Sequence, residues 1–73
     1  MTQSERIIRH LRDYGSISSM EAVQEYGIMR LASRISDLRR AGIPIHREMV
    51  SAKNRYGEAT SYARYFIDRE GVR

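Results

Sequence analysis

The sequence predicts an α+β fold of three short helices followed by a C-terminal β-hairpin, and two observations carry this prediction. Apolar residues recur at helical spacing in three successive segments, each of which ends at a glycine. Pro44 then bars further helix, and the chain continues into an aromatic-rich run with alternating side chains. With 73 residues there is room for one small domain, which we place at residues 1–67, and residues 68–73 are expected to fray.

The first two helices are each expected to begin with a capping box, in which a hydroxyl and a glutamate satisfy the free amides of the first turn. Thr2 and Glu5 form the first box, and Ser18 and Glu21 form the second. The positions expected to face inward are Ile7, Ile8, Leu11 and Tyr14 in the first helix, and Ala22, Val23 and Tyr26 in the second.

The third helix is predicted within residues 28–42, where Gly42 provides the stop. Its apolar face combines Ile28, Leu31, Ile35 and Leu38 at helical spacing. The opposite face is polar and rich in arginine, as expected of a helix that contacts DNA. The candidate contact residues on it are Arg30, Ser33, Arg34, Asp37 and Arg40.

The hairpin is predicted from strands over about residues 43–52 and 60–67, joined by a turn at residues 53–58 with Gly57 in the left-handed conformation. Alternation in the second strand places Ala63, Tyr65 and Ile67 on one face and Tyr62, Arg64 and Phe66 on the other. Residues 16–18 are too few for a helix and are a candidate short extra strand.

The charge is positive and unevenly distributed. The net charge is +4, and twelve of the thirteen basic residues are arginine, whose planar fork suits phosphate and base-edge recognition. Residues 28–47 carry a net charge of +4, against −1 for residues 1–27 and +1 for residues 48–73. This distribution favours a polyanionic partner at the third helix and its exit, although a solvated basic surface would have the same composition.

Catalysis, metal binding and membrane insertion find little support. There are no cysteines, and the two histidines, His10 and His46, are interpreted as ordinary surface or boundary residues. Neither a Gly-x-Ser-x-Gly elbow nor a His-Glu-x-x-His motif occurs. No apolar run approaches the roughly 20 residues that span a bilayer. We therefore expect a cytoplasmic protein that is not an enzyme and uses no metal, cofactor or small-molecule substrate.

Three helices followed by a hairpin with a basic turn form the winged helix-turn-helix arrangement, and a set of motifs carries a closer resemblance. These are Thr2-Gln3, Arg6-Ile7-Ile8, Gly15-Ser16-Ile17-Ser18, Glu21-Ala22, Gly27-Ile28, the run from Arg30 to Arg39, Gly42-Ile43-Pro44-Ile45, Val50, the run from Lys53 to Gly57, and Ala63-Arg64-Tyr65. Through them the chain resembles small winged helix-turn-helix domains that are encoded mostly by bacteriophages and prophages. The resemblance implies DNA binding and a regulatory role. Ser33 and Ser36 stand where a repressor-type motif has apolar residues, so repressor docking is not transferred to this chain.

In the third helix, Arg30 is the first candidate for base or phosphate contact, because an arginine in the major groove can bridge two acceptors of guanine. The alternative is a solvated surface arginine. Arg34 lies at the edge of the polar face, where it also suits a structural bridge. Asp37 either accepts from a cytosine amine or orients Arg34 and Arg40 through contacts three residues away.

Two further sets of residues would hold the DNA backbone. Ser18 and Ser19, at the start of the second helix, are a candidate phosphate seat in addition to their capping role. The hairpin turn is the wing, and its polarity would also follow from simple exposure. The wing candidates are Arg47, Lys53, Asn54, Arg55 and Tyr56.

The sequence thus predicts sequence-specific binding of double-stranded DNA by a phage or prophage transcriptional regulator, with the third helix in the major groove. The alternative is a protein-interaction module of phage origin that binds and inhibits a host protein. A homodimer is a further candidate assembly. Tyr62 and Phe66 are candidates for a self-association or partner surface, unless they cover the first helix as part of the core.

Overall fold

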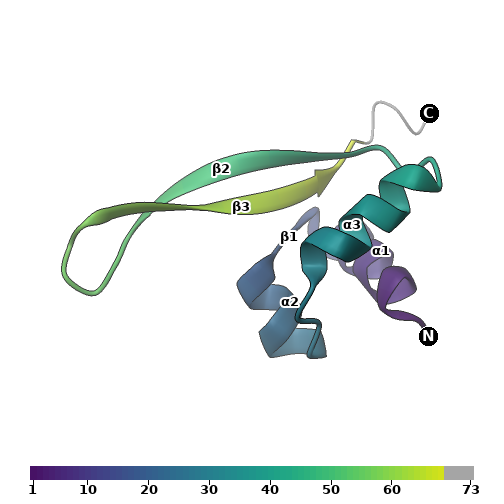
Figure 1. The fold of residues 1–73 in the computed structure, drawn as a ribbon, viewed down its shortest axis with the longest axis horizontal. Coiled ribbons are helices and arrows are strands. Elements are labelled where there is room, and N and C mark those ends of the chain that lie inside the picture. The colour runs from purple at the N-terminus through teal and green to yellow at the C-terminus, as the bar shows by residue number, and fades with distance from the viewer. Residues whose placement is uncertain (69–73) are drawn as a thin grey trace.

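The structure, a computed structural model, describes residues 1–68 as three helices beside a three-stranded antiparallel sheet (Figure 1). The elements are α1 (Gln3–Tyr14), β1 (Ser16–Ser18), α2 (Ser19–Tyr26), α3 (Leu31–Arg40), β2 (Ile45–Lys53) and β3 (Ala59–Ile67). This is the predicted α+β winged arrangement, and the short strand at residues 16–18 is confirmed. Of the tail predicted to fray, only residue 68 is among the described residues.

Both predicted capping boxes are present. In α1 the Glu5 amide donates to Oγ1 of Thr2 at 3.1 Å, and the Thr2 amide donates to the Glu5 carboxylate at 2.8 Å. In α2 the Glu21 amide donates to Oγ of Ser18 at 3.3 Å, and the Ser18 amide donates to Oε1 of Glu21 at 2.9 Å. The glycine after each of these helices takes a left-handed conformation, with φ of 89° and 68°. Local sequence therefore sets both ends of α1 and α2.

The third helix begins three residues later than the apolar spacing predicts. It starts at Leu31, while Ile28 belongs to the turn that precedes it. The amide of Ile28 donates back to the carbonyl of Ala22 at 3.0 Å, so the end of α2 holds this residue. Its side chain is nevertheless buried, which explains why it matched the apolar stripe of the helix.

One apolar core joins the helices to the sheet. Its ten buried members are Ile7, Leu11, Ile17, Ala22, Ile28, Leu31, Ile35, Leu38, Ile45 and Tyr65. Two residues expected to face inward do not: Tyr14 is 74% exposed and Val23 is 40% exposed. Tyr14 is the last residue of α1, beyond the part of the helix that packs on the core. Val23 lies on α2, a helix of eight residues in which only Ala22 is buried.

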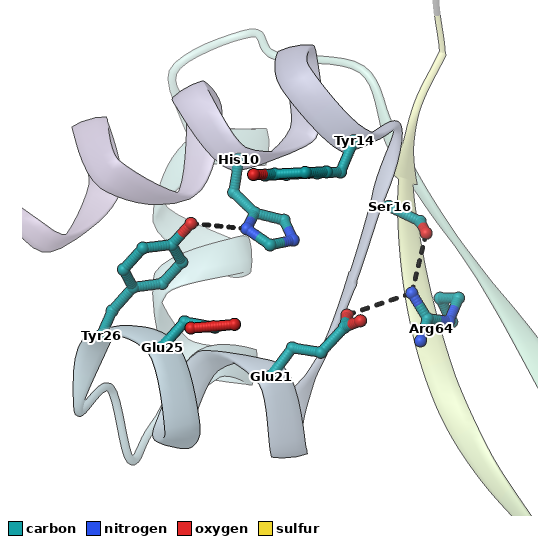
Figure 2. Close-up of a pocket in the computed structure, with 7 residues that line it drawn as sticks. All are labelled: His10, Tyr14, Ser16, Glu21, Glu25, Tyr26 and Arg64. Atoms are coloured by element: carbon teal, nitrogen blue, oxygen red, sulfur yellow. Dashed lines mark hydrogen bonds and ion pairs between the residues drawn. The ribbon is translucent and has the colours of Figure 1, made fainter.

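His10 is buried, contrary to its interpretation as a surface or boundary residue, with only 6% of its surface exposed. A hydrogen bond of 2.6 Å joins its Nδ1 to the hydroxyl of Tyr26 on α2, and Figure 2 shows this pair bridging the two helices. The tyrosine hydroxyl gives one of the two ring nitrogens a hydrogen-bond partner, which favours burial of this polar ring. His46, by contrast, is exposed, as predicted.

The sheet has the order β1-β3-β2, so the last strand lies in the middle. β2 and β3 pair along all nine residues, from Ile45 opposite Ile67 to Lys53 opposite Ala59. The predicted hairpin is thus confirmed, with strand limits shifted by one or two residues. Gly57 has φ of 78°, as the turn prediction requires.

The predicted alternation of β3 is confirmed. Tyr65 is buried, and Ala63 and Ile67 pack against the core. Tyr62 and Phe66 lie on the opposite face of the sheet, so they do not cover α1 as core. Phe66 instead stacks on the imidazole of His46, with ring centroids 5.3 Å apart.

The hairpin extends well beyond the third strand. β1 pairs only with residues 64–66 of β3. Residues 49–63 therefore form a two-stranded ribbon, which we call the overhanging hairpin. Figure 1 shows it reaching past the helices on the side of α2.

Candidate nucleic-acid interface

The face of α3 that points away from the core is the predicted polar stripe. Leu31, Ile35 and Leu38 are buried, and helical geometry places Ser33, Asp37 and Arg40 on the opposite side. Ser36, which was not among the predicted contact residues, is also exposed on this helix. Its helical spacing could have identified it, because it lies between Ser33 and Arg40 on the outer face. The exposed surface of α3 is therefore small, polar and basic at its C-terminal end.

Arg30 occupies the N-cap position of α3 rather than its first turn. Its side chain is exposed and makes no capping hydrogen bond, so α3 lacks the side-chain cap that α1 and α2 have. The guanidinium is therefore at the end of α3 that follows the turn, available to a partner.

Asp37 connects two arginines on the surface of α3. Its carboxylate lies 3.2 Å from Nη2 of Arg34 and 3.9 Å from Nη1 of Arg40. This is the orienting arrangement that was one of the two alternatives predicted for Asp37. Nε of Arg34 is buried without a hydrogen-bond partner among the described residues, so Arg34 is held against the body of the protein. Arg40, with its side chain 80% exposed, is the freer of the two.

The basic residues of β2 face the same side as the helices. Ile17, Tyr65 and Arg47 stand in one row across the three strands, and directly paired residues share a face. Because Tyr65 is part of the core, Arg47 points to the side of the sheet that bears the helices. Lys53 lies six residues further along β2 and shares that face. A partner that contacts this side of the hairpin would meet both cations.

The turn of the hairpin is organised by Asn54. Its Oδ1 accepts from the amides of Tyr56 and Glu58 at 2.9 and 3.0 Å, and its Nδ2 donates to the Glu58 carboxylate at 3.0 Å. Asn54 therefore has a structural role in shaping the turn. Arg55 and Tyr56 project from it, and Tyr56 is 83% exposed.

The start of α2 offers less to a phosphate than the sequence suggested. Ser18 is 4% exposed and its hydroxyl caps the helix. Ser19, the first residue of α2, is exposed. A contact with phosphate at this end would therefore come from Ser19 and not from the side chain of Ser18.

The cations of the candidate interface differ from the others in their partners. Arg9, Arg34, Arg40 and Arg64 each lie within 4 Å of a carboxylate. In contrast, six exposed cations form no ion pair with any described residue. Two of them have another contact: the guanidinium of Arg6 lies over the ring of Tyr26, and Nε of Arg39 donates to the carbonyl of Ile45. The four without such a contact lie at the start of α3 and along the hairpin, and they are Arg30, Arg47, Lys53 and Arg55.

Arg64 joins the hairpin to α2, a contact that the sequence reasoning did not find. Its Nη1 donates to Oγ of Ser16 at 2.8 Å and to Oε1 of Glu21 at 3.0 Å (Figure 2). Burial tends to raise the pKa of Glu21, but the Ser18 amide and the Arg64 guanidinium outweigh it and the pKa is lowered. Glu21 and Arg64 are 43 residues apart in sequence, so only the fold brings them together.

The described residues hold no group of three histidine, cysteine or acidic side chains that could bind a metal ion. None of the helices within residues 1–68 has the length and apolar character needed to cross a membrane. A pocket of about 340 Å³ opens between α1, α2 and β3, and Figure 2 shows α3 behind it. This pocket therefore lies away from the outer face of α3.

A comparison with protein-family models places the whole arrangement in a known family. A model described as a winged helix-turn-helix domain matches residues 2–70. No curated protein matches the sequence. The matched range includes every helix and strand of the fold, together with the stripe on α3 and the hairpin. The chain belongs to the winged helix-turn-helix domain family, whose fold suggests DNA binding.

Proposed function

We propose that this protein binds double-stranded DNA in a sequence-specific manner and regulates transcription. In this proposal α3 enters the major groove, whose width of roughly 12 Å admits a helix. The hairpin then lies along the neighbouring backbone or minor groove, where an arginine is favoured if the groove is narrow. The resemblance of the chain to domains of phage and prophage origin supports a phage or prophage setting.

The observation that carries the proposal is the placement of uncompensated cations. Arg30, Arg47, Lys53 and Arg55 lack an ion-pair partner within residues 1–68 and lie on the two elements that a winged domain presents to DNA. Unpaired cations on a surface attract phosphates, because binding releases the counterions condensed on the duplex. The paired arginines Arg9 and Arg34 lack this advantage.

The candidate residues take different roles in the proposal. Arg30 and Ser33, with Arg40 at the other end of α3, would read base edges or phosphates. Arg47, Lys53, Arg55 and Tyr56 would contact the backbone, and Ser19 would add a phosphate contact. Asp37, Arg34 and Asn54 would support these residues, since their side chains are engaged within the protein.

The test is a titration of a fluorescent random-sequence duplex of about two helical turns, roughly 20 base pairs, at several salt concentrations. With about five phosphate contacts, the logarithm of the association constant should fall against the logarithm of salt with a slope of about −4 to −5. Selection of bound fragments from genomic DNA would then identify the target. If no duplex binds even at low salt, the proposal is wrong and the alternative of a protein partner is favoured.

A further inference from the structure

Few contacts fix the orientation of the overhanging hairpin relative to the helices. Residues 49–63 pair only with each other, because β1 ends opposite Arg64. A two-stranded ribbon is only marginally stable and bends readily where a third strand ends. Wing contacts and α3 contacts can act on one duplex only if the ribbon keeps a defined angle to the helices. A contact at the point where β1 ends is therefore needed to hold this angle.

Arg64 stands at this point. Of the three residues of β3 that pair with β1, it is the one next to the overhanging hairpin, and its partner is Ser18, the N-cap of α2. Its Nη1 contacts Ser16 on β1 and Glu21 on α2, at 2.8 and 3.0 Å. One guanidinium nitrogen therefore ties the base of the overhanging hairpin to both a strand and a helix.

The acceptor on α2 is itself fixed. Oε1 of Glu21 accepts from Arg64 and also from the amide of Ser18, within the capping box that begins α2. Both side chains are partly shielded, with 23% of Arg64 and 36% of Glu21 exposed. Hydrogen bonds to charged groups in such sites are stronger than neutral ones. The carboxylate thus links the base of the hairpin directly to the first turn of α2.

We propose that Arg64 is a positioning residue that, through Glu21 and Ser16, fixes the overhanging hairpin relative to α2 so that hairpin and α3 engage the same duplex. This inference rests on the proposed DNA binding. It concerns how the two contact surfaces are coupled, and it assigns Arg64 no contact with DNA.

A double-mutant cycle tests the coupling. The wing variant Lys53→Ala/Arg55→Ala should weaken binding by roughly five- to tenfold per lost contact near 0.1 M salt. Arg64→Met should cause a similar loss, and combining it with the wing variant should add less than about twofold, since the hairpin is already misplaced. The loss of affinity caused by Arg30→Ala, at the N-cap of α3, should in contrast multiply with the loss caused by Arg64→Met. If the Arg64 and wing effects simply multiply, or if Arg64→Met binds like the wild type, the inference is wrong.

Glu21→Ala separates positioning from charge. On charge alone, removing a carboxylate should strengthen binding to DNA. The positioning role predicts the opposite, a loss comparable to that of Arg64→Met. Glu5→Ala is the matched control, because it removes the same charge and the same type of capping contact but has no link to the hairpin. Equal effects of Glu5→Ala and Glu21→Ala would overturn the inference.

A measurement on the free protein distinguishes failure of this inference from failure of the proposed function. Backbone amide relaxation should give order parameters of about 0.85 for residues 49–63 in the wild type and clearly lower values in Arg64→Met and Glu21→Ala. Arg64→Lys, which keeps a positively charged donor at this position, should restore part of the order. Unchanged order in both variants refutes the positioning role, whether or not the wild type binds DNA. Increased mobility without any wild-type DNA binding refutes the proposed function instead.

Discussion

The two ends of the hairpin differ in what surrounds them, although the same two strands form both. At the base, Ile45, Tyr65 and Ile67 contact the core, and β1 adds a third strand. In the overhanging hairpin the large side chains face solvent, with Met49 59% and Tyr56 83% exposed. Strand pairing continues unchanged from one end to the other. Full burial is therefore confined to the base of the hairpin.

This contrast separates stability from binding along a single element. Residues at the base contribute to folding because they remove apolar surface from water. Residues of the overhanging hairpin contribute little stability through burial, so most of their side chains are exposed to a binding partner. Lys53 and Arg55, which have no carboxylate partner among the described residues, belong to this second group. Substitutions along the hairpin should accordingly change from stability effects to binding effects.

The largest expected difference compares two tyrosines of β3. Tyr65 is 7% exposed and Tyr62 is 39% exposed on the opposite face. Tyr65→Ala should cost about 3 kcal/mol of unfolding free energy because it leaves a cavity in the core. Tyr62→Ala should cost about 0.5 kcal/mol, as is usual for a surface site. Urea denaturation followed by circular dichroism measures both, and equal losses would show that burial does not divide the hairpin as described.

A smaller effect is expected at the junction between the two regions. The pKa of Glu21 is lowered, because the Ser18 amide and Arg64 outweigh the opposing effect of burial. A lowered folded-state pKa contributes stability above the unfolded value, about 4.3, and that stability is lost as the pH falls through the folded value. Glu21→Gln should therefore reduce the acid-induced fall of the thermal midpoint between about pH 5 and pH 3.

Glu5 provides the comparison for this pH effect. Its pKa is also lowered, by hydrogen bonds from the backbone and side chain of Thr2, but no arginine joins it to the hairpin. Glu5→Gln should flatten the same part of the pH profile while leaving the order of residues 49–63 unchanged. A Glu21→Gln profile that coincides with the wild type would contradict the role given to the Arg64 contact.

Local signals in the sequence sufficed for most of the fold. The boxes at Thr2 and Ser18, the glycine stops and the alternation of β3 each depend on neighbours within a few residues, and the structure confirms them. The predicted start of α3 at residue 28 is wrong, because Ile28 is apolar and buried but its amide is bound by the end of α2. Periodicity reports burial, and burial is not the same as helix.

The features that depend on distant partners could not be predicted. His10 is buried because the hydroxyl of Tyr26 lies on another helix at 2.6 Å. Arg64 reaches Glu21 across 43 residues. Neither pair has a spacing that a sequence pattern could reveal. For the candidate interface, the sequence identified the residue types, and the fold then divided them into paired and unpaired cations.

We expect the unpaired cations of the hairpin, rather than positive charge in general, to bind the DNA backbone. The direct test is the salt dependence of duplex binding for two variants with equal charge loss. In Arg47→Ala/Lys53→Ala/Arg55→Ala the slope should become less steep by about 2.7, at ~0.9 per lost phosphate contact. In Arg6→Ala/Arg9→Ala/Arg12→Ala, on α1, the slope should stay near that of the wild type. Equal reductions in both variants, or none in either, would contradict the claim.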